Sequence, residues 1–239
     1  MEQSQLISKS IADAIIERPH GFSIGSRHFY LYPVTLGKIY VLRDLVDSLG
    51  MDETALRENP FAESLRLAQE KREVCCQILT YHTMRGKDEV FDNRLVQKTK
   101  KFLLRNVEEK DLAAMLIICL TSDKTAEYVK HLKLDKEDDR MKQVMSVKQD
   151  RNSFTFGGKS VYGSLIDTAC ERYGWTMDYV VWGISFTNLQ LLLKDSVKTI
   201  YLSEEERKKV HITDVHDEER IDASDPDFIK KARAFMKGE

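Results

Sequence analysis

Apolar residues recur at helical spacing over most of this chain, and polar residues fill the positions between them. This period predicts an amphipathic helix over residues 5–17 and further helices over 36–49, 61–85, 93–105, 108–121 and 136–148. Thr35 and Asp135 suit the N-caps of the second and the last of these helices, because their side-chain oxygens can accept from free backbone N–H groups. Gly50 suits the position after a helix end, and Asn59-Pro60 is typical of a helix start.

One N-terminal region alternates instead. Phe22 to Ile24 and Phe29 to Leu31 flank Gly25-Ser26, which predicts a β-hairpin with glycine at the turn. A lone hairpin is only marginally stable in water, so we expect it to lie on helices or to pair with another chain.

The second half shows the same helical period after a break. Residues 149–160 form an expected loop containing Gly157-Gly158, and a helix follows from a Ser160 cap to Tyr173. Thr176 opens a strongly apolar segment that continues to about Leu202, with Gly183 and Asn188 as candidate breaks. Ser203 and Glu206 have the spacing of a capping box, and a weaker helix is expected near 226–236.

These patterns predict a mainly α fold with a small N-terminal β-hairpin, built as one unit or as two helical lobes. The expected division is an amphipathic arm (1–20), a hairpin plus helical lobe (21–148), an apolar helical lobe (149–202) and a charged C-terminal tail (203–239).

Composition limits the partners and the compartment. The 239 residues include 37 Lys and Arg against 39 Asp and Glu, a balance that provides no global field for nucleic acid or an anionic membrane. The longest apolar run, Leu112 to Leu120, is about half of a membrane span, and the N-terminus lacks the pattern of a secretory signal. The four cysteines show no disulfide spacing. We therefore expect a soluble protein in the reducing cytoplasm, with no membrane association.

Familiar catalytic and metal motifs fail on spacing. Gly158-Lys159-Ser160 resembles the end of a phosphate loop, but position 153 is Ser where that loop needs Gly. The cluster of His211, Asp214, His216 and Asp217 lacks zinc-ligand spacing, and adjacent cysteines on a helix point about 100° apart. No glycine-flanked serine elbow is present. We expect no cofactor, no metal and no enzymatic activity, although an active site assembled from distant residues stays an open alternative.

Basic residues cluster at Lys98, Lys100, Lys101 and Arg105, where a solvated helix face is the ordinary interpretation. Nucleic-acid binding would gain support if the fold gathered these residues with Lys130 and Lys133 on one face.

The most informative segment lies between Tyr173 and Leu202 and contains both tryptophans of the chain. Large side chains at 3-4-3-4 spacing predict one apolar stripe on a helix, which is buried in the core, in an oligomer interface or against a client helix. The candidate partner-binding residues are Trp175, Tyr179, Trp182, Phe186, Leu189 and Leu193.

Two stretches carry a family resemblance: residues 22–38, with Phe22-Ser-Ile-Gly25, Phe29-Tyr-Leu-Tyr-Pro33 and Thr35-Leu-Gly-Lys38, and residues 173–185, Tyr-Gly-Trp-Thr-Met-Asp-Tyr-Val-Val-Trp-Gly-Ile-Ser. Together they resemble tail assembly chaperones of long-tailed bacteriophages and prophages. The resemblance implies a non-enzymatic helical protein that coats the tape-measure protein in the bacterial host cytoplasm before the tail tube polymerises.

Two other functions stay open: a structural phage connector or tail completion protein, and an enzyme or DNA-binding factor of a mobile element. A homo-oligomer is also compatible with the apolar stripe.

Overall fold

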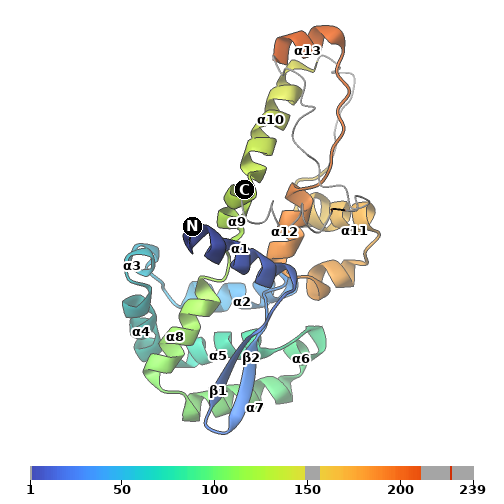
Figure 1. Ribbon diagram of the computed structural model, residues 1–239. Helices are drawn as coiled ribbons and strands as arrows, with labels where there is room; N and C mark the ends of the chain where they lie inside the picture. The colour runs from blue at the N-terminus through green and yellow to red at the C-terminus, as the bar shows by residue number, and fades with distance from the viewer. Residues whose placement is uncertain (1, 149–156, 211–226, 228–239) are drawn as a thin grey trace.

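The computed structural model describes residues 2–148, 157–210 and 227 (Figure 1). The described chain is 71% helical and carries one antiparallel two-stranded hairpin, which confirms the mainly α fold with a small N-terminal hairpin. The elements are α1 (Glu2–Ile15), β1 (His20–Ile24), β2 (Arg27–Leu31), α2 (Leu36–Ser48), α3 (Glu53–Glu58), α4 (Pro60–Glu70), α5 (Arg72–Thr83), α6 (Lys87–Phe91), α7 (Asn93–Asn106), α8 (Glu109–Leu120), α9 (Thr125–His131), α10 (Leu134–Val147), the π-helical η1 (Tyr162–Asp167), α11 (Thr168–Tyr173), the π-helical η2 (Tyr179–Gly183), α12 (Phe186–Lys194) and α13 (Glu204–Val210).

The hairpin turns at Gly25-Ser26, as the sequence predicts, and Gly25 adopts a left-handed φ of +58°. Phe22 and Phe29 face each other across the strands with ring centroids 5.5 Å apart. The hairpin lies on helices, because Phe29 also contacts Phe102 of α7, at 5.6 Å between ring centroids. This contact supplies the support that a two-stranded sheet needs.

Local signals fix α2 at both ends. The Thr35 hydroxyl accepts a hydrogen bond from the Lys38 N–H, and Gly50 takes a left-handed φ of +62° just beyond the helix. Both features agree with the predicted cap and stop.

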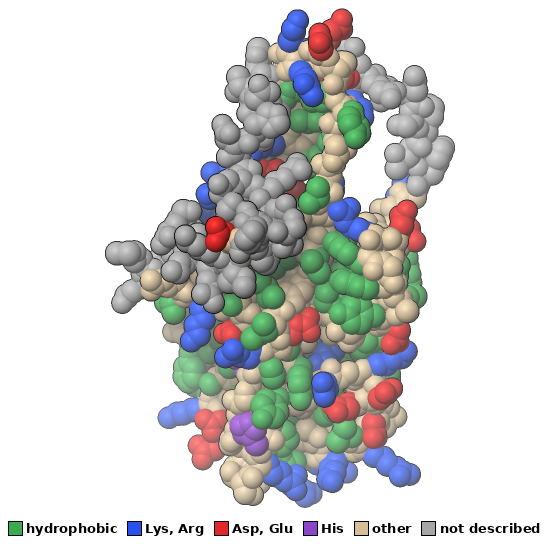
Figure 2. All heavy atoms as spheres, turned by 45° about the vertical axis from the view of Figure 1, so that its right-hand side comes forward, with side chains coloured by type: hydrophobic (Ala, Val, Ile, Leu, Met, Phe, Trp, Pro, Cys, Tyr) green, Lys and Arg blue, Asp and Glu red, His purple; other side chains and the backbone are tan. Residues whose placement is uncertain are grey.

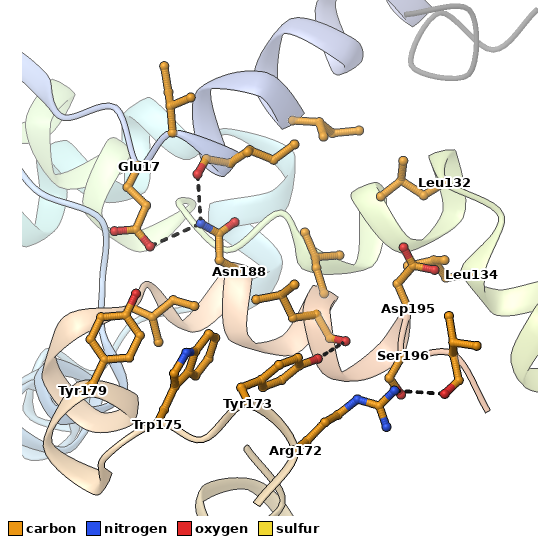
Figure 3. A pocket seen from close by; sticks show the side chains of 17 residues that line it. Glu17, Leu132, Leu134, Arg172, Tyr173, Trp175, Tyr179, Asn188, Asp195 and Ser196 are labelled. Atoms are coloured by element: carbon orange, nitrogen blue, oxygen red, sulfur yellow. Dashed lines mark hydrogen bonds between the residues drawn. The ribbon is translucent and has the colours of Figure 1, made fainter. Parts of the chain in front are cut away.

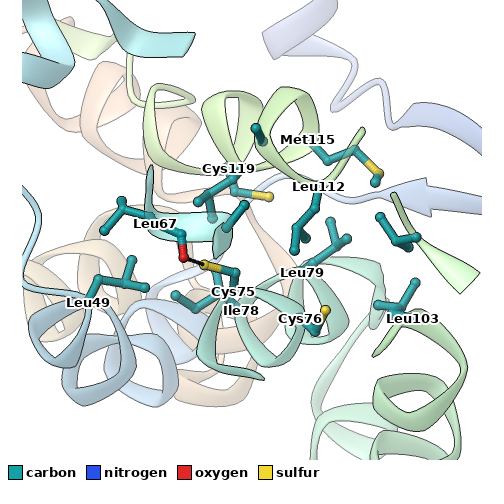
Figure 4. Close-up of a cluster of buried hydrophobic side chains, with 14 of the residues drawn as sticks. Leu49, Leu67, Cys75, Cys76, Ile78, Leu79, Leu103, Leu112, Met115 and Cys119 are labelled. Carbon is teal, nitrogen blue, oxygen red and sulfur yellow. Dashed lines mark hydrogen bonds between the residues drawn. The ribbon is translucent and has the colours of Figure 1, made fainter. Parts of the chain in front are cut away.

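The main core lies where α4, α5, α7 and α8 meet, with α2 and β2 along its edge (Figure 4). Its fully buried members include Leu67 of α4, Ile78 and Leu79 of α5, Leu103 of α7 and Leu112 of α8. The three cysteines Cys75, Cys76 and Cys119 are also buried in it as free thiols.

The structure corrects the predicted helix over 61–85. The chain breaks at Lys71, whose backbone (φ −125°, ψ 32°) separates α4 from α5. The break allows α4 to pack on α8 while α5 turns towards α2 and α7. The polar residues 69–73 (Gln-Glu-Lys-Arg-Glu) across this break are all good helix formers, so helix propensity alone does not reveal it.

The predicted cap at Asp135 is also wrong. Helix α10 begins at Leu134, after Lys133 takes a left-handed φ of +58°, so Asp135 lies in the first turn. Leu134 is buried with Ile11 and Tyr128, and this packing favours the earlier helix start. The short helices α3, α6 and α9 were not predicted, because each has seven residues or fewer.

The second half forms a smaller cluster beside α2, built from η1, α11, η2 and α12. Gly174 ends α11 with a φ of +64°, as expected. The predicted apolar helix from Thr176 to Leu202 is interrupted at Gly183, and Ile184 and Ser185 are extended before α12 begins. Helix α12 then ends at Lys194, well short of Leu202.

Figure 1 shows how these parts are arranged: the main core lies below α1, and α10 rises from α9 to meet α13 at the far end. The capping box that starts α13 is confirmed, since the Ser203 N–H donates to Glu206 and the Glu206 N–H donates to the Ser203 hydroxyl. No helix within the described ranges has both the length and the apolar character needed to cross a membrane.

Residues 149–156 of the predicted loop and the expected helix near 226–236, apart from Asp227, lie outside the described residues. The division into an arm, two lobes and a tail stays a prediction. Contacts do join its parts, because α1 packs on α12 and α2 packs on η2.

Candidate protein-binding groove

A pocket of about 760 Å³ opens between α1, the junction of α9 with α10, and residues 172–197 (Figure 3). Segments distant in sequence build its walls, so no local motif could reveal it. The lining residues are Ile11, Ile15, Ile16, Glu17, Leu132, Leu134, Arg172, Tyr173, Trp175, Tyr179, Ile184, Asn188, Leu191, Leu192, Asp195, Ser196 and Val197. We call this feature the groove.

Three aromatic side chains form one wall of the groove. Tyr173 stacks on Trp175 with centroids 4.6 Å apart, and Trp175 meets Tyr179 edge to face at 5.1 Å. The Tyr173 hydroxyl donates to the Leu192 carbonyl at 2.8 Å, which ties this wall to α12. Aromatic rows of this kind present large rigid apolar surfaces, which supply much of the binding energy at protein interfaces.

Glu17 and Asn188 join the two helices that flank the groove, α1 and α12. A Glu17 carboxylate oxygen accepts from the Ser185 N–H at 2.7 Å and from the Asn188 side-chain amide at 3.2 Å. The same amide donates to the Ala14 carbonyl at 3.0 Å. Glu17 itself has a left-handed φ of +52°, which is unusual for a residue with a side chain. These contacts fix the relative position of the two walls.

The C-terminal end of α12 carries a carboxylate without a cation. Burial raises the pKa of Asp195, and the nearby Glu137 raises it further. Among the described residues, Asp195 has no ion-pair or hydrogen-bond partner for its side chain, because Lys194 pairs with Asp138 instead. The C-terminal end of a helix is itself negative, so this corner of the groove favours a positive group.

The rim of the groove exposes large apolar side chains to solvent. The exposed fractions are 56% for Ile15, 60% for Ile16, 43% for Tyr179, 41% for Leu192 and 69% for Val197. Single exposed apolar residues are common, but a group of them around a concave surface is typical of an interaction site. Figure 2 shows apolar side chains beside both charge signs on one face of the molecule.

The residues of the predicted apolar stripe do not share one surface. Trp175 and Tyr179 line the groove, whereas Trp182 packs edge to face on Phe91, at 5.5 Å between centroids. Leu189 is fully buried in the second-half cluster. Two features separate these residues: the π-helical η2 places Trp182 against Gly37 of α2 and Phe91, and the extended Ile184 and Ser185 interrupt the helical period before α12. Phe186 and Leu193 pack against the same buried cluster.

The sequence patterns did not predict the wall of the groove that faces Trp175 and Tyr179. Ile15 and Ile16 at the end of α1, and Val197 beyond α12, complete the groove. The only sequence signal for the first pair is that two adjacent isoleucines precede Pro19 at a helix end, where one of them must face away from an amphipathic core.

A second unusual group of side chains is buried away from the groove. Lys38 is only 1% exposed and its ammonium has no hydrogen-bond partner, so desolvation lowers its pKa to about 8, while Glu89 partly opposes the shift. His82 is 5% exposed, and burial lowers its pKa to about 4. Burial raises the pKa of Cys119 to about 12, which keeps the thiol protonated and unreactive. These three groups do not line the groove.

The basic residues do not gather as nucleic-acid binding would require. Lys98, Lys100, Lys101 and Arg105 lie on α7, at the lower end of the molecule in Figure 1, whereas Lys130 lies on α9, beside α1 and α12, and Lys133 directly precedes α10. Lys100 is also engaged in an ion pair with Glu73 at 2.7 Å.

No group of three or more His, Cys, Asp or Glu side chains with the geometry of a metal site occurs in the part of the chain that the structure describes. The sequence cluster His211, Asp214, His216 and Asp217 lies outside the described residues.

The groove is therefore the best candidate for a functional site within the described ranges, on the grounds of its shape, its aromatic wall and its exposed apolar rim. Comparisons of this chain with protein-family models, with curated proteins and with solved structures find no match.

Proposed function

We propose that this protein binds other proteins, and that the groove receives an apolar helical segment of its client. The observation that carries the proposal is the rim of five exposed apolar side chains around a pocket with an aromatic wall. An amphipathic helix places two or three side chains of one face into such a pocket and covers the rim with their neighbours.

The polar groups of the groove support binding rather than chemistry. Glu17 and Asn188 are engaged with backbone groups that hold α1 and α12 together. Arg172 donates to the Val197 carbonyl at 2.9 Å, and the Tyr173 hydroxyl is committed to Leu192. Groups held in this way position the walls, and they leave apolar contact as the main source of affinity.

Within this class, we propose a tail assembly chaperone that binds the tape-measure protein. The support is the resemblance of residues 22–38 and 173–185, and the second of these stretches supplies Trp175 and Tyr179 to the groove. A tape-measure protein is a long helical client with apolar faces, which a groove of this kind can keep soluble before tube subunits arrive.

Co-expression with the tape-measure protein of the same tail module tests the proposal. The client should appear in a soluble complex only when this chain is present. Replacing Ile16 and Val197 together by Asp should weaken the complex by at least about 100-fold, because each side chain loses roughly 1.5–3 kcal/mol of apolar burial.

Leu6→Asp is the matched control for these variants. Leu6 lies on the same helix as Ile15, is 67% exposed and does not line the groove, so its variant should keep the complex. A client that stays equally insoluble with and without this chain would refute the proposal. Mass spectrometry of purified particles checks the assignment as a chaperone, because a connector or completion protein would remain in the virion.

A further inference from the structure

The C-terminal segment of this chain, residues 228–239, has the chemistry of a ligand for the groove. Its sequence is Phe-Ile-Lys-Lys-Ala-Arg-Ala-Phe-Met-Lys-Gly-Glu. The apolar residues Phe228, Ile229, Ala232, Phe235 and Met236 fall at i, i+1, i+4, i+7 and i+8, which places them on one face of a helix. The segment also contains four Lys and Arg against one terminal Glu, so it is a basic amphipathic helix by pattern.

The groove is complementary to this segment in apolar surface and in charge. Its rim offers apolar contact from Ile15, Ile16 and Val197. Its charged corner, at the C-terminal end of α12, holds the Asp195 carboxylate with Glu137 nearby and no cation beside Asp195 among the described residues. A basic side chain of the segment would supply the missing partner, while an acidic segment would be repelled.

The chain is long enough for this contact. Helix α13 ends at Val210 and packs against α10, whose other end supplies Leu134 to the groove. Helix α10 has 14 residues, which corresponds to about 21 Å at 1.5 Å per residue. The 17 residues from 211 to 227 can span up to about 55 Å when extended, so Phe228 can reach the groove.

We propose that residues 228–239 bind in the groove of their own chain as an amphipathic helix and cover it until a client displaces them. The device goes beyond the proposed function, because it does not depend on which client the groove receives. It would protect the exposed apolar rim from unspecific association, and clients would need to compete with an internal ligand.

The test compares the full-length protein with two full-length variants of the segment. Phe235→Asp puts a charge on the apolar face, whereas Ala234→Asp puts the same charge on the opposite face and is the matched control. Neither position belongs to the core of the described fold, so both proteins should still unfold cooperatively, and Phe235→Asp should lose only the small helical circular dichroism signal of the released segment.

The probe is a fluorescently labelled peptide of residues 224–239, titrated against each protein. With an effective concentration of roughly 1 mM for the tethered segment and a Kd of about 10 µM, the peptide should bind Phe235→Asp on the order of 100-fold more tightly than the parent. Ala234→Asp should behave like the parent. Equal affinity for all three proteins would overturn the proposal.

Two further measurements sharpen the test. In a Trp182→Phe background Trp175 is the single tryptophan, so acrylamide quenching reports on the groove and should increase in Phe235→Asp alone. Asp195→Asn added to Phe235→Asp should weaken peptide binding several-fold, and unchanged affinity would overturn the charge pairing. If the protection of Trp175 from acrylamide depended on protein concentration, the segment would bind another copy of the chain, and this would overturn the intramolecular arrangement. Client capture by the groove is measured separately, so the proposed function can survive the failure of this inference.

Discussion

Gly37 lies so close to the indole of Trp182 that a Cβ added at Gly37 would be 2.7 Å from the ring atoms. Gly37 belongs to α2 and Trp182 to η2, so this contact joins the first half of the chain to the second. The absence of a side chain at position 37 allows the helix backbone to meet the flat face of the indole directly.

Gly37→Ala should therefore destabilise the protein although alanine favours helices. Overpacking costs roughly 1–3 kcal/mol, and the gain in helix propensity returns about 1 kcal/mol, so a net loss of up to about 2 kcal/mol in the free energy of unfolding is expected. Urea unfolding measures it as a lower midpoint at unchanged slope.

The control is Gly86→Ala, because a Cβ at Gly86 meets no atom within 4 Å. Its free energy of unfolding should stay within about 0.5 kcal/mol of the parent. If Gly37→Ala matched Gly86→Ala, the contact between α2 and η2 would be looser than the structure indicates. Combining Gly37→Ala with Trp182→Phe should restore part of the loss, because neighbouring sites are not additive.

Lys38→Met should stabilise the protein at neutral pH. The Lys38 ammonium is buried without a hydrogen-bond partner, and its nearest aromatic contact is Tyr32, with the ammonium 5.7 Å from the ring centroid. Methionine keeps the apolar part of the side chain and removes the desolvated charge. We expect a gain of roughly 1–4 kcal/mol. The exposed Lys101→Met is the control, and a loss of stability in Lys38→Met would contradict the reading of Lys38 as an uncompensated charge.

Lys38 also predicts a pH dependence at alkaline pH. Its folded pKa of about 8 lies below the unfolded value of 10.5, so the unfolded chain binds more protons between these two values. Stability contributed at this site therefore rises as pH increases from about 8 to 10.5. The difference in the free energy of unfolding between the parent and Lys38→Met should narrow by roughly 3 kcal/mol between pH 8 and pH 10.5. A constant difference across the window would show that Lys38 titrates normally.

His82 predicts the corresponding effect in acid. The Ile78 carbonyl can only accept, so His82 donates from Nδ1 at 2.9 Å and is held neutral. Burial lowers its pKa from 6.5 to about 4, so the unfolded chain binds the extra proton between these values and stability falls as pH decreases through them. His82→Asn keeps a donor near Nδ1 without titrating. Between pH 7 and pH 4 the free energy of unfolding of the parent should fall by roughly 3 kcal/mol more than that of this variant. Chemical denaturation at each pH measures the difference.

The sequence predicted local structure correctly where a single side chain determines a helix cap or a turn. The Thr35 cap, the glycine turn at Gly25 and the capping box of Ser203 and Glu206 are confirmed. Each rests on a hydrogen bond or a backbone conformation that needs only neighbouring residues. Breaks set by distant packing were missed, as at Lys71, where α4 ends on α8 and α5 turns to pack on α2 and α7 as well as on α8.

The groove was also predicted only in part, because distant packing forms one of its walls. The apolar segment containing Trp175 and Tyr179 was identified from sequence, and these two residues do line the groove. Trp182, in the same helix as Tyr179, packs against Gly37 of α2 and Phe91 instead, and the facing wall comes from α1, more than 150 residues away in the chain. No period or motif encodes that proximity, because it results from the packing of α1 on α12.

Glu17 offers a test of how the two walls of the groove are held. Glu17→Ala removes the acceptor for the Ser185 N–H and the Asn188 amide, and alanine keeps the strain of a φ of +52°. Glu17→Gly removes the same acceptor but relieves that strain, which is worth roughly 1–2 kcal/mol. Both variants should lower the free energy of unfolding, Glu17→Ala by roughly 1–3 kcal/mol and Glu17→Gly by less. Both should also weaken peptide or client binding to the groove, because α1 is no longer tied to α12.

Urea unfolding and the peptide titration separate the two effects of these Glu17 variants. The backbone strain acts on stability alone, whereas the lost hydrogen bonds act on both stability and binding. Equal stability of the two variants would mean that residue 17 does not adopt the left-handed conformation, and unchanged binding in both would mean that the walls are positioned by apolar packing without the Glu17 hydrogen bonds.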